Sequence, residues 1–342
     1  MGGNLPRVLA EARNSIRSMV PAGSKVLVAC SGGADSLALA AAAAFLHRKG
    51  EILAGAVIVD HGMQPGSLAA AQRAAEQCRG LGLAEVLLIG AHVQGHSEQS
   101  ARSARYAAFE AAMARTGAGH VLLGHTLDDQ AEQVLLGLAR GSGTLSLSGM
   151  PVARGPYLRP LLGLRRAEIE QICRHEGLGY WEDPTNTDPR YLRNRVRHEL
   201  MPVIESVLGA QVPAALARTA ALARADAEYL DSVAETMLDE VLGDAGAEAG
   251  ESVCDLDLER LRAMPGALRS RVLRMAVARL GAPAPDFERL AALELLVHGS
   301  KSAGPIQLQG PVYASRMAGE RLQHGARPAL QLDATALPTA RS

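Results

Sequence analysis

Lysine is nearly absent from this sequence, which has three lysines among 342 residues, so almost all of its positive charge is arginine. The net charge of −1 argues against an evenly basic protein that coats nucleic acid. The arginines gather instead in two stretches, which are Arg190, Arg193, Arg195 and Arg197, and Arg260, Arg262, Arg269, Arg271, Arg274 and Arg279. Local basic patches on a nearly neutral chain suit a partner that touches selected faces.

Cysteines are also few. Four occur, at Cys30, Cys78, Cys173 and Cys254, and no two of them are spaced as C-x-x-C. This spacing gives no indication of a zinc site or a redox pair, and it favours buried thiols in a reducing compartment.

Long apolar runs are missing as well, and no leader segment is expected. No apolar run reaches the roughly 18 residues that a membrane span needs, and the first residues lack a basic segment followed by an apolar core. We therefore expect a cytoplasmic protein without a membrane partner. The sequence leaves the oligomeric state open, with a homodimer among the options. With 48% hydrophobic residues, the chain can fill two cores at roughly 150 residues per domain.

The first half of the chain alternates between strand-like and helix-like segments. Strands are expected at residues 25–29, 52–59, 86–89 and 120–123, and the helices that follow them end at about residues 49, 81, 115 and 140. This alternation predicts an α/β fold, a parallel sheet with helices on both faces. Ligands of such sheets bind beyond the carboxyl ends of the strands, where residues 31–36 and 125–129 stand.

The second half has a different pattern. After a glycine- and serine-rich loop at 141–149 and a mixed segment at 150–200, we expect helices at 212–242, 256–262, 265–280 and 286–297. Short strand-like pieces follow at 304–322, and the chain is expected to fray beyond residue 325. The predicted division is an α/β domain at 1–202, a smaller and mainly helical domain at 203–325, and a flexible tail at 326–342.

The segment Ser31-Gly32-Gly33-Ala34-Asp35-Ser36 joins an apolar strand to the start of a helix. Such a junction aims backbone N–H groups and the positive end of the helix at one point, which favours an anion such as phosphate. The glycines let the backbone approach phosphate oxygens, and Asp35 is a candidate ligand for the magnesium that accompanies a nucleotide. The pattern G-x-x-x-x-G-K-[ST] occurs nowhere in the chain. The alternative interpretation is an ordinary strand–helix turn with a serine cap.

A second motif follows the fourth expected strand, from Gly124 through His125 to Glu132. Asp129 and Glu132 are three residues apart and so are neighbours on one helix face. Two converging carboxylates suit either a metal ion or the ammonium group of an amino acid. The alternative is a near capping box between Thr126 and Asp129, which leaves His125 and Glu132 unexplained.

These motifs carry a family resemblance. S-G-G-x-D-S resembles the pyrophosphate loop (PP-loop) of the ATP pyrophosphatases, enzymes that cleave ATP to AMP and pyrophosphate. Three further stretches resemble the tRNA(Ile)-lysidine synthase family within that group, and the resemblance covers about residues 25–202. They are residues 123–143, Arg102-x-x-Arg105-Tyr106, and residues 182–197 with Glu182-Asp183-Pro184-Thr185-Asn186 at their start. One departure is Met63-Gln64, where many members have Leu-Arg.

The resemblance implies a reaction in two steps, with ATP and Mg²⁺, on a tRNA(Ile) that has a CAU anticodon. The carbonyl oxygen at C2 of the wobble cytidine attacks the α-phosphate of ATP, and pyrophosphate leaves. The ε-amine of free lysine then attacks C2 and displaces AMP, which gives lysidine. The first domain would bind ATP and catalyse, and the second would bind tRNA.

The resemblance also implies roles for individual residues. Ser31, Gly32, Gly33, Ala34, Asp35, Ser36 and Arg105 would bind ATP, with Asp35 also holding magnesium. Asp35, Arg105, His125 and Asp129 would be catalytic, and Asp129 and Glu132 would orient lysine. Arg190, Arg193, Arg195 and Arg197 would bind tRNA phosphates, because arginine matches their oxygens with paired donors. The sequence does not decide whether a carboxylate or His125 deprotonates the amine.

Other interpretations stay open at this point. The arginines at 190–197 also fit a solvated helix face paired with Asp188 and Glu199, and Tyr180-Trp181 also fits core packing. A PP-loop tRNA thiolase would use the same loop with a sulfur-carrying cysteine, for which Cys30 is the neighbouring candidate. A regulatory nucleotide-binding module would keep the loop but has no need of Asp129 and Glu132.

Overall fold

The computed structural model describes residues 6–60, 62, 66–90, 98–141, 143–242, 252–301, 303–317 and 328–334. The chain forms two compact units, residues 1–141 with 146–221, and residues 142–145 with 222–342. The units divide within α10 (Val212–Leu242), whereas the sequence places a domain boundary at residue 202. That earlier boundary stays a prediction.

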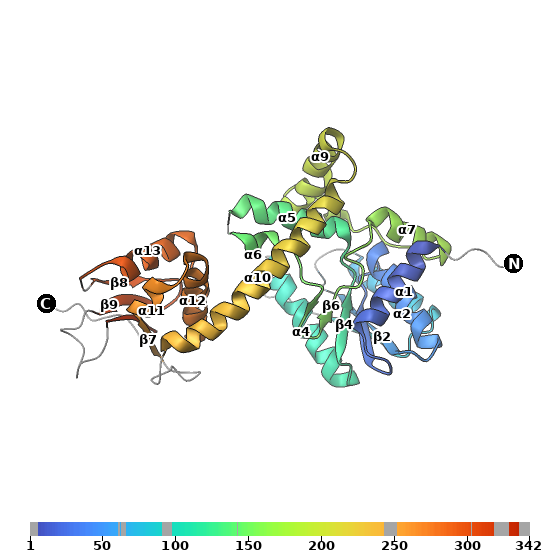
Figure 1. Ribbon diagram of the computed structural model, residues 1–342. Helices are drawn as coiled ribbons and strands as arrows, with labels where there is room; N and C mark the ends of the chain where they lie inside the picture. The colour runs from blue at the N-terminus through green and yellow to red at the C-terminus, as the bar shows by residue number, and fades with distance from the viewer. Residues whose placement is uncertain are drawn as a thin grey trace. The chain divides into compact units, whose positions relative to one another are not determined.

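The first unit is built on a six-stranded sheet with the order β3-β2-β1-β4-β6-β5 (Figure 1). The strands are β1 (Lys25–Ala29), β2 (Leu53–Asp60), β3 (Val86–Gly90), β4 (His120–Leu123), β5 (Ala153–Arg154) and β6 (Tyr157–Leu158). All neighbours pair in parallel except β5 and β6, which are antiparallel. The predicted α/β fold with a mainly parallel sheet is confirmed.

Helices cover both faces of this sheet, because alternate residues of each strand point to opposite sides. On one face α1 (Arg7–Met19), α2 (Ala34–Arg48), α3 (Ser67–Gly80) and α7 (Arg166–His175) pack over Val28 and its neighbours. On the other face α4 (Glu98–Thr116) packs Phe109 against Leu27 and Val57. The sequence did not predict α1.

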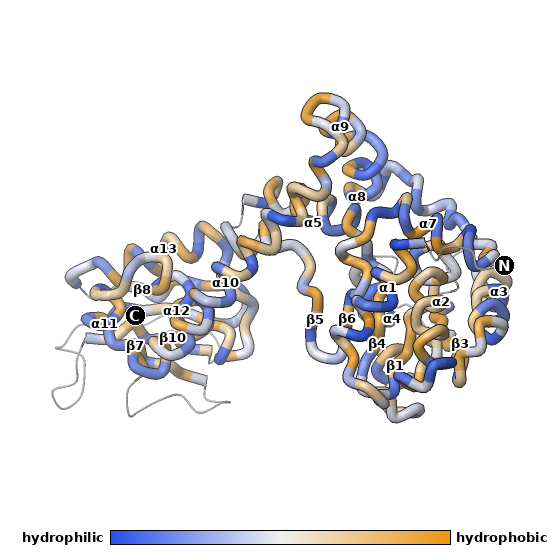
Figure 2. Tube along the Cα trace, turned by 45° about the vertical axis from the view of Figure 1, so that its right-hand side comes forward, coloured by the Kyte–Doolittle hydropathy of each residue, from blue (hydrophilic) through white to orange (hydrophobic). Residues whose placement is uncertain are grey.

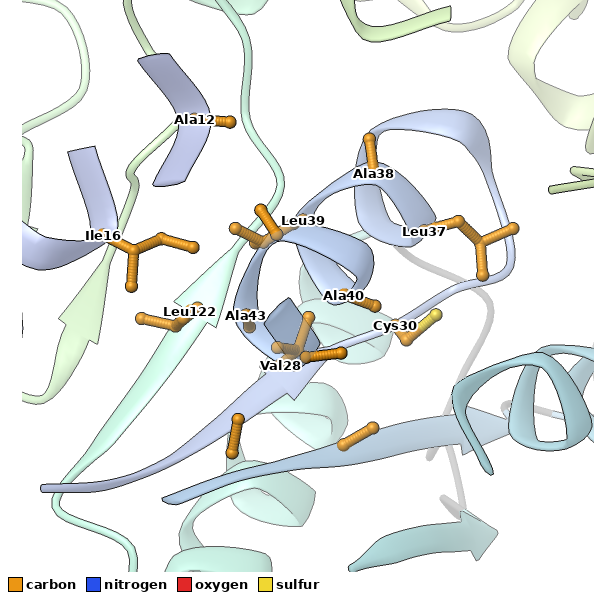
Figure 3. Close-up of a cluster of buried hydrophobic side chains, with 14 of the residues drawn as sticks. Ala12, Ile16, Val28, Cys30, Leu37, Ala38, Leu39, Ala40, Ala43 and Leu122 are labelled. Carbon is orange, nitrogen blue, oxygen red and sulfur yellow. The ribbon is translucent and has the colours of Figure 1, made fainter. Parts of the chain in front are cut away.

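The helix α2 fixes the position of the loop that precedes it. Hydrophobic residues gather around β1 and α2 (Figure 2), and ten residues of α2 are buried, most of them alanine. Figure 3 shows Leu39 of α2 together with Ile16 of α1 and with Val28 and Leu122 of the strands. Small side chains let the helix lie close to the sheet, so its N-terminus is held at the carboxyl end of β1.

Beyond β4 the first unit continues with α5 (Leu127–Arg140) and the 3₁₀ turn Pro184–Thr187, and the division between the units also falls within α6 (Thr144–Leu147). Three consecutive helical pieces then follow, which are α8 (Leu192–Arg195), the π-helical turn η2 (Val196–Leu200) and α9 (Met201–Leu208). Both α5 and η2 carry charged residues that the sequence assigned to the site.

The described part of the second unit contains residues 222–242 of α10, the helices α11 (Leu258–Ala263), α12 (Gly266–Arg279) and α13 (Phe287–His298), and a four-stranded antiparallel sheet. The sheet order is β7-β10-β9-β8, with β7 (Val253–Asp257), β8 (Ala303–Gln307), β9 (Tyr313–Met317) and β10 (Ala329–Asp333). A smaller second domain is confirmed, with a sheet beside its helices. The expected fraying does not extend to β10, because it pairs with β7 and β9 and buries Leu330 and Leu332.

No single helix in the described ranges is long and apolar enough to span a membrane. The segments 192–208 and 212–242, bent by 99° to each other, meet that test of length and composition only as a pair.

Candidate active site

The loop between β1 and α2 is shaped from within by Ser36. Its hydroxyl accepts a hydrogen bond from the backbone N–H of Ser31 at 3.1 Å and donates one to the carbonyl oxygen of Gly33 at 2.9 Å. Gly33 is the N-cap of α2, and no side chain caps that helix. The structure therefore does not have the serine-capped turn, and no side-chain cap occupies the N–H groups of the first helical turn.

Two backbone contacts bring other segments to the loop. The N–H of Trp181 donates to the carbonyl oxygen of Gly32 at 2.9 Å. Gly124 lies so close to the start of α2 that an added Cβ would be 3.0 Å from the carbonyl carbon and oxygen of Asp35. The second motif therefore meets the loop directly, and the glycine there is required by the close approach.

The two carboxylate oxygens of Asp35 differ in their contacts. Oδ2 lies 3.5 Å from Nη2 of Arg166, whereas Oδ1 is buried and has no hydrogen-bond partner among the described residues. Burial raises the pKa of this carboxyl to about 6, with Arg166 opposing the shift and Asp129 adding to it.

An unpartnered carboxylate oxygen fits a hard cation such as magnesium. No three His, Cys, Asp or Glu side chains in the described ranges converge as a metal site. Magnesium is often held by one or two carboxylates with phosphate and water completing its shell, and Asp35 fits that use.

Asp129 takes part in the capping box that the sequence left as an alternative. Its Oδ2 accepts from the N–H and the hydroxyl of Thr126, at 2.8 and 3.0 Å, and its own N–H donates to Thr126 Oγ1 at 3.4 Å. Its other oxygen, Oδ1, accepts from Nη2 of Arg197 at 2.8 Å and lies 3.3 Å from Nη2 of Arg193. The neighbouring arginines hold the pKa of Asp129 below its usual range, against the opposing effect of burial, which is the largest single influence.

Glu132 is bound on both oxygens by the same two arginines. Arg197 donates from Nε to Oε1 at 2.6 Å and from Nη2 to Oε2 at 3.0 Å, and Nε of Arg193 donates to Oε2 at 2.9 Å. The Glu132 side chain is 2% exposed, against 19% for Arg197 and 33% for Arg193. We call Asp129, Glu132, Arg193 and Arg197 the ion-pair cluster.

The four arginines assigned to tRNA phosphates thus divide into two pairs. Arg193 and Arg197 turn toward the two carboxylates assigned to lysine, so the structure joins two predicted sites into one. Arg190 pairs with Asp188 at 2.6 Å and Arg195 with Glu199 at 3.4 Å, both at the surface, as the solvated-face alternative expects. The role of each arginine in binding stays a prediction.

Sequence reasoning missed two further charged residues, Arg165 and Arg166, at the start of α7. Nε of Arg165 donates to Asp128 Oδ1 at 3.0 Å, and the N–H of Arg166 donates to Asp128 Oδ2 at 2.7 Å. Arg166 Nη2 also lies 3.5 Å from Oδ1 of Asp129. No local pattern indicates these contacts, because they join segments more than 35 residues apart.

His125 lies between β4 and α5 as a neutral imidazole. Burial lowers its pKa to about 4, with the charge of Asp129 opposing the shift and Arg159 adding to it. Its Nδ1 is buried without a hydrogen-bond partner among the described residues. Arg105 is exposed on α4, and its contact with ATP stays a prediction. Met63 and Gln64 lie outside the described residues.

The remaining candidates are Tyr180, Trp181 and Cys30. Tyr180 packs against the buried cluster around α2, as the core-packing alternative expects, and Trp181 is half-buried. Cys30 is buried, with its Sγ 3.6 Å from Ser36 Oγ, and all four cysteines are free and buried.

Two known domain families match this chain, one after the other. Residues 7–204 match the model of the PP-loop domain, and residues 256–322 match the TilS substrate binding domain. Among solved structures, the U34-tRNA thiolase NcsA from Methanococcus maripaludis with its [4Fe-4S] cluster is 17% identical with a TM-score of 0.53. The similarity covers 62% of this chain and 76% of that chain, and it shows the fold alone.

Relatives at higher identity extend over most of the chain. Proteins named tRNA(Ile)-lysidine synthase are 47% identical in Leifsonia xyli over 84% of this chain and 86% of the relative, and 46% identical in Streptomyces coelicolor over 88% and 85%. Another from Thermobifida fusca is 44% identical over 92% of this chain and 95% of the relative. On these grounds, and with both domain models matched in order, the chain belongs to the tRNA(Ile)-lysidine synthase family.

Proposed function

We propose that this chain ligates free lysine to C2 of the wobble cytidine of tRNA(Ile) with a CAU anticodon, releasing AMP and pyrophosphate. The main support is the set of relatives named for this activity, which match 84–92% of the chain at 44–47% identity. We further propose that the reaction takes place in the cytoplasm, where a tRNA substrate is available.

In the first step, the loop holds the phosphates of ATP. The uncapped N-terminus of α2 supplies N–H donors for the leaving pyrophosphate. The hydroxyls of Ser31 and Ser36, 3.3 Å apart, would add donors once Ser36 gives up its hydrogen bond to the Gly33 carbonyl oxygen. Asp35 would hold magnesium on its unpartnered oxygen, and this ion would offset the negative charge of the phosphates. Arg105 is proposed to add positive charge at the α-phosphate.

In the second step, Asp129 and Glu132 orient lysine. Both carboxylates are buried and accept hydrogen bonds from Arg193 and Arg197, so we propose that an ammonium group binds them where a guanidinium gives up a contact. For removal of the amine proton, His125 offers a neutral nitrogen without a partner, although its low pKa makes it a weak base.

The experiment is an omission series with full-length protein, tRNA(Ile) transcript, ATP and lysine. We expect AMP and pyrophosphate to form only when tRNA is present, and pyrophosphate to be released from tRNA and ATP without lysine. Absence of ATP cleavage under all conditions would indicate a regulatory module.

A tRNA thiolase is the second candidate, since the solved thiolase has a similar fold. The variant Cys30→Ala tests it, because Cys30 adjoins the loop. We expect retained activity with lysine and no product with a sulfur donor. A thiolated tRNA from the unmodified chain would instead favour the thiolase.

A further inference from the structure

The arginines around the site differ in how completely their donors are used. Arg197 makes three hydrogen bonds of 2.6 to 3.0 Å to the two carboxylates of the ion-pair cluster. Arg193 makes one of 2.9 Å and two longer ones. Both guanidinium groups are therefore engaged by acids in the structure as it stands.

Arg166 is held much more loosely. Its Nη2 lies 3.5 Å from Asp35 Oδ2 and 3.5 Å from Asp129 Oδ1, at the outer limit of a hydrogen bond. Its Nε is buried and has no hydrogen-bond partner among the described residues. Its backbone is nevertheless fixed, because its N–H donates to Asp128 at 2.7 Å.

Arg166 and Asp35 therefore form one ion pair in which each partner has a buried, unused polar atom. The unused atom of Asp35 is an acceptor, and that of Arg166 is a donor. Buried polar groups are rarely left unpaired. The open oxygen of Asp35 and the two 3.5 Å contacts of Arg166 Nη2 together suit a ligand that supplies both a cation and an anionic oxygen. A metal-bound phosphate has both, and the pair adjoins the N-terminus of α2.

We propose that Arg166 binds a phosphate oxygen of ATP beside Asp35, an inference that rests on the proposed use of ATP in the first step. The guanidinium side chain is 32% exposed, so a nucleotide can reach it from solvent. Binding replaces two ion-pair contacts at the 3.5 Å limit with a charge-assisted hydrogen bond of ordinary length, which is stronger because it is shorter. Arg166 thereby becomes a phosphate contact that the sequence motifs did not indicate.

The test measures binding of Mg²⁺ with the non-hydrolysable α,β-methylene analogue of ATP, by calorimetry with saturating tRNA(Ile). We expect Arg166→Ala to weaken binding of the analogue about tenfold or more, the loss typical of a charged hydrogen bond. Arg166→Lys should restore part of the affinity, because the charge remains without the planar fork. Arg174→Ala is the matched control on the same helix, with a side chain 64% exposed and a 3.7 Å ion pair to Glu170, and it should bind as the unmodified chain does.

A thermal melt of each variant separates binding from folding. We expect Arg166→Ala to melt close to the unmodified chain, since it loses only 3.5 Å contacts. Unchanged affinity in Arg166→Ala would overturn the proposal. It would also be overturned if Arg166→Ala lost affinity together with a lowered melting temperature and Arg166→Lys recovered none of that affinity. If the unmodified chain binds the analogue but makes no lysidine, the proposed function fails while the Arg166 assignment stands.

Discussion

Glu132 is a carboxylate buried between two guanidinium groups. Removing water from charges is costly, and the attraction between them offsets that cost only when the hydrogen bonds are complete. Here both oxygens accept from arginine, so the cluster is satisfied as long as every member is present. Loss of one charge would leave the others buried without compensation.

The variant Glu132→Gln tests both the contribution of the ion-pair cluster to stability and its proposed role in binding lysine. We expect unfolding to become easier by about 3 kcal/mol, the lower end for a broken buried pair because Arg193 is one-third exposed. If the pair also binds lysine, the KM for lysine should rise about tenfold or more while that for ATP changes little. Equal changes in both would contradict the lysine assignment, and an unchanged melting temperature would contradict the ion-pair cluster.

His125 makes stability depend on pH. Its pKa falls from the usual 6.5 to about 4 on folding, so between these values the unfolded chain binds a proton that the folded chain does not. Stability is therefore lost as pH falls from 6.5 toward 4, by up to about 3 kcal/mol from this residue.

Urea unfolding of the unmodified chain and of His125→Gln at pH 7 and pH 5 measures this contribution. We expect the unmodified chain to lose more stability than the variant on acidification, because glutamine does not titrate. A loss of equal size in both would show that His125 is not responsible.

At the scale of elements, the shape of the phosphate loop depends on the backbone conformation between the end of β1 and the start of α2. Gly32 has a φ of +83°, and an added Cβ would be 3.2 Å from Cβ of Ala74 on α3. An L side chain at that position strains the backbone and presses on α3. The glycine therefore sets both the curvature of the loop and its distance from the helix.

Gly32→Ala should lower ATP cleavage at least tenfold, because it shifts the N–H groups that face the phosphates. Gly50→Ala is the matched control, since Gly50 also has a positive φ, of +71°, but has no atom within 4 Å of an added Cβ. Both should lose some stability, and only the first should lose activity. Equal activity in the two variants would place the phosphates elsewhere.

Sequence patterns predicted the helices, strands and loops that can be identified from a short stretch of neighbouring residues. The run 25–29, the two glycines and the alanine-rich helix identify β1, the loop and α2 because strand, turn and helix signals follow one another. Short strands such as β7 and β10 were missed, because the two buried side chains of β7 and the three of β10 are too few to establish a pattern and their pairing partners lie far along the chain. The ion-pair cluster was missed for the same reason: Glu132 and Arg197 are 65 residues apart.

At the scale of the whole molecule, a nearly neutral chain must bind tRNA through selected surfaces. Of the arginines at 190–197, Arg190 and Arg195 are exposed and hold only surface ion pairs, which contribute little to stability. These two are therefore able to exchange their carboxylate partners for phosphates at low cost.

The double variant Arg190→Ala with Arg195→Ala should weaken tRNA binding and reduce the slope of log affinity against log salt by about two, because each phosphate contact releases counterions. Filter binding across a salt series measures it, with Arg17→Ala, another exposed arginine paired with Glu51, as the control. A slope equal to that of the control would place these arginines on a solvated face without tRNA.

The most direct test of the proposed function is the transfer of lysine itself. Full-length protein is incubated with ATP, labelled lysine and a tRNA(Ile) transcript that has a CAU anticodon, and the tRNA is digested and analysed by mass spectrometry of its nucleosides. The proposal predicts that one cytidine per tRNA gains the mass of lysine less water, in step with AMP release, and that a transcript with the wobble cytidine replaced stays unlabelled. Unmodified cytidine after ATP cleavage, or a sulfur-containing nucleoside in its place, would contradict it.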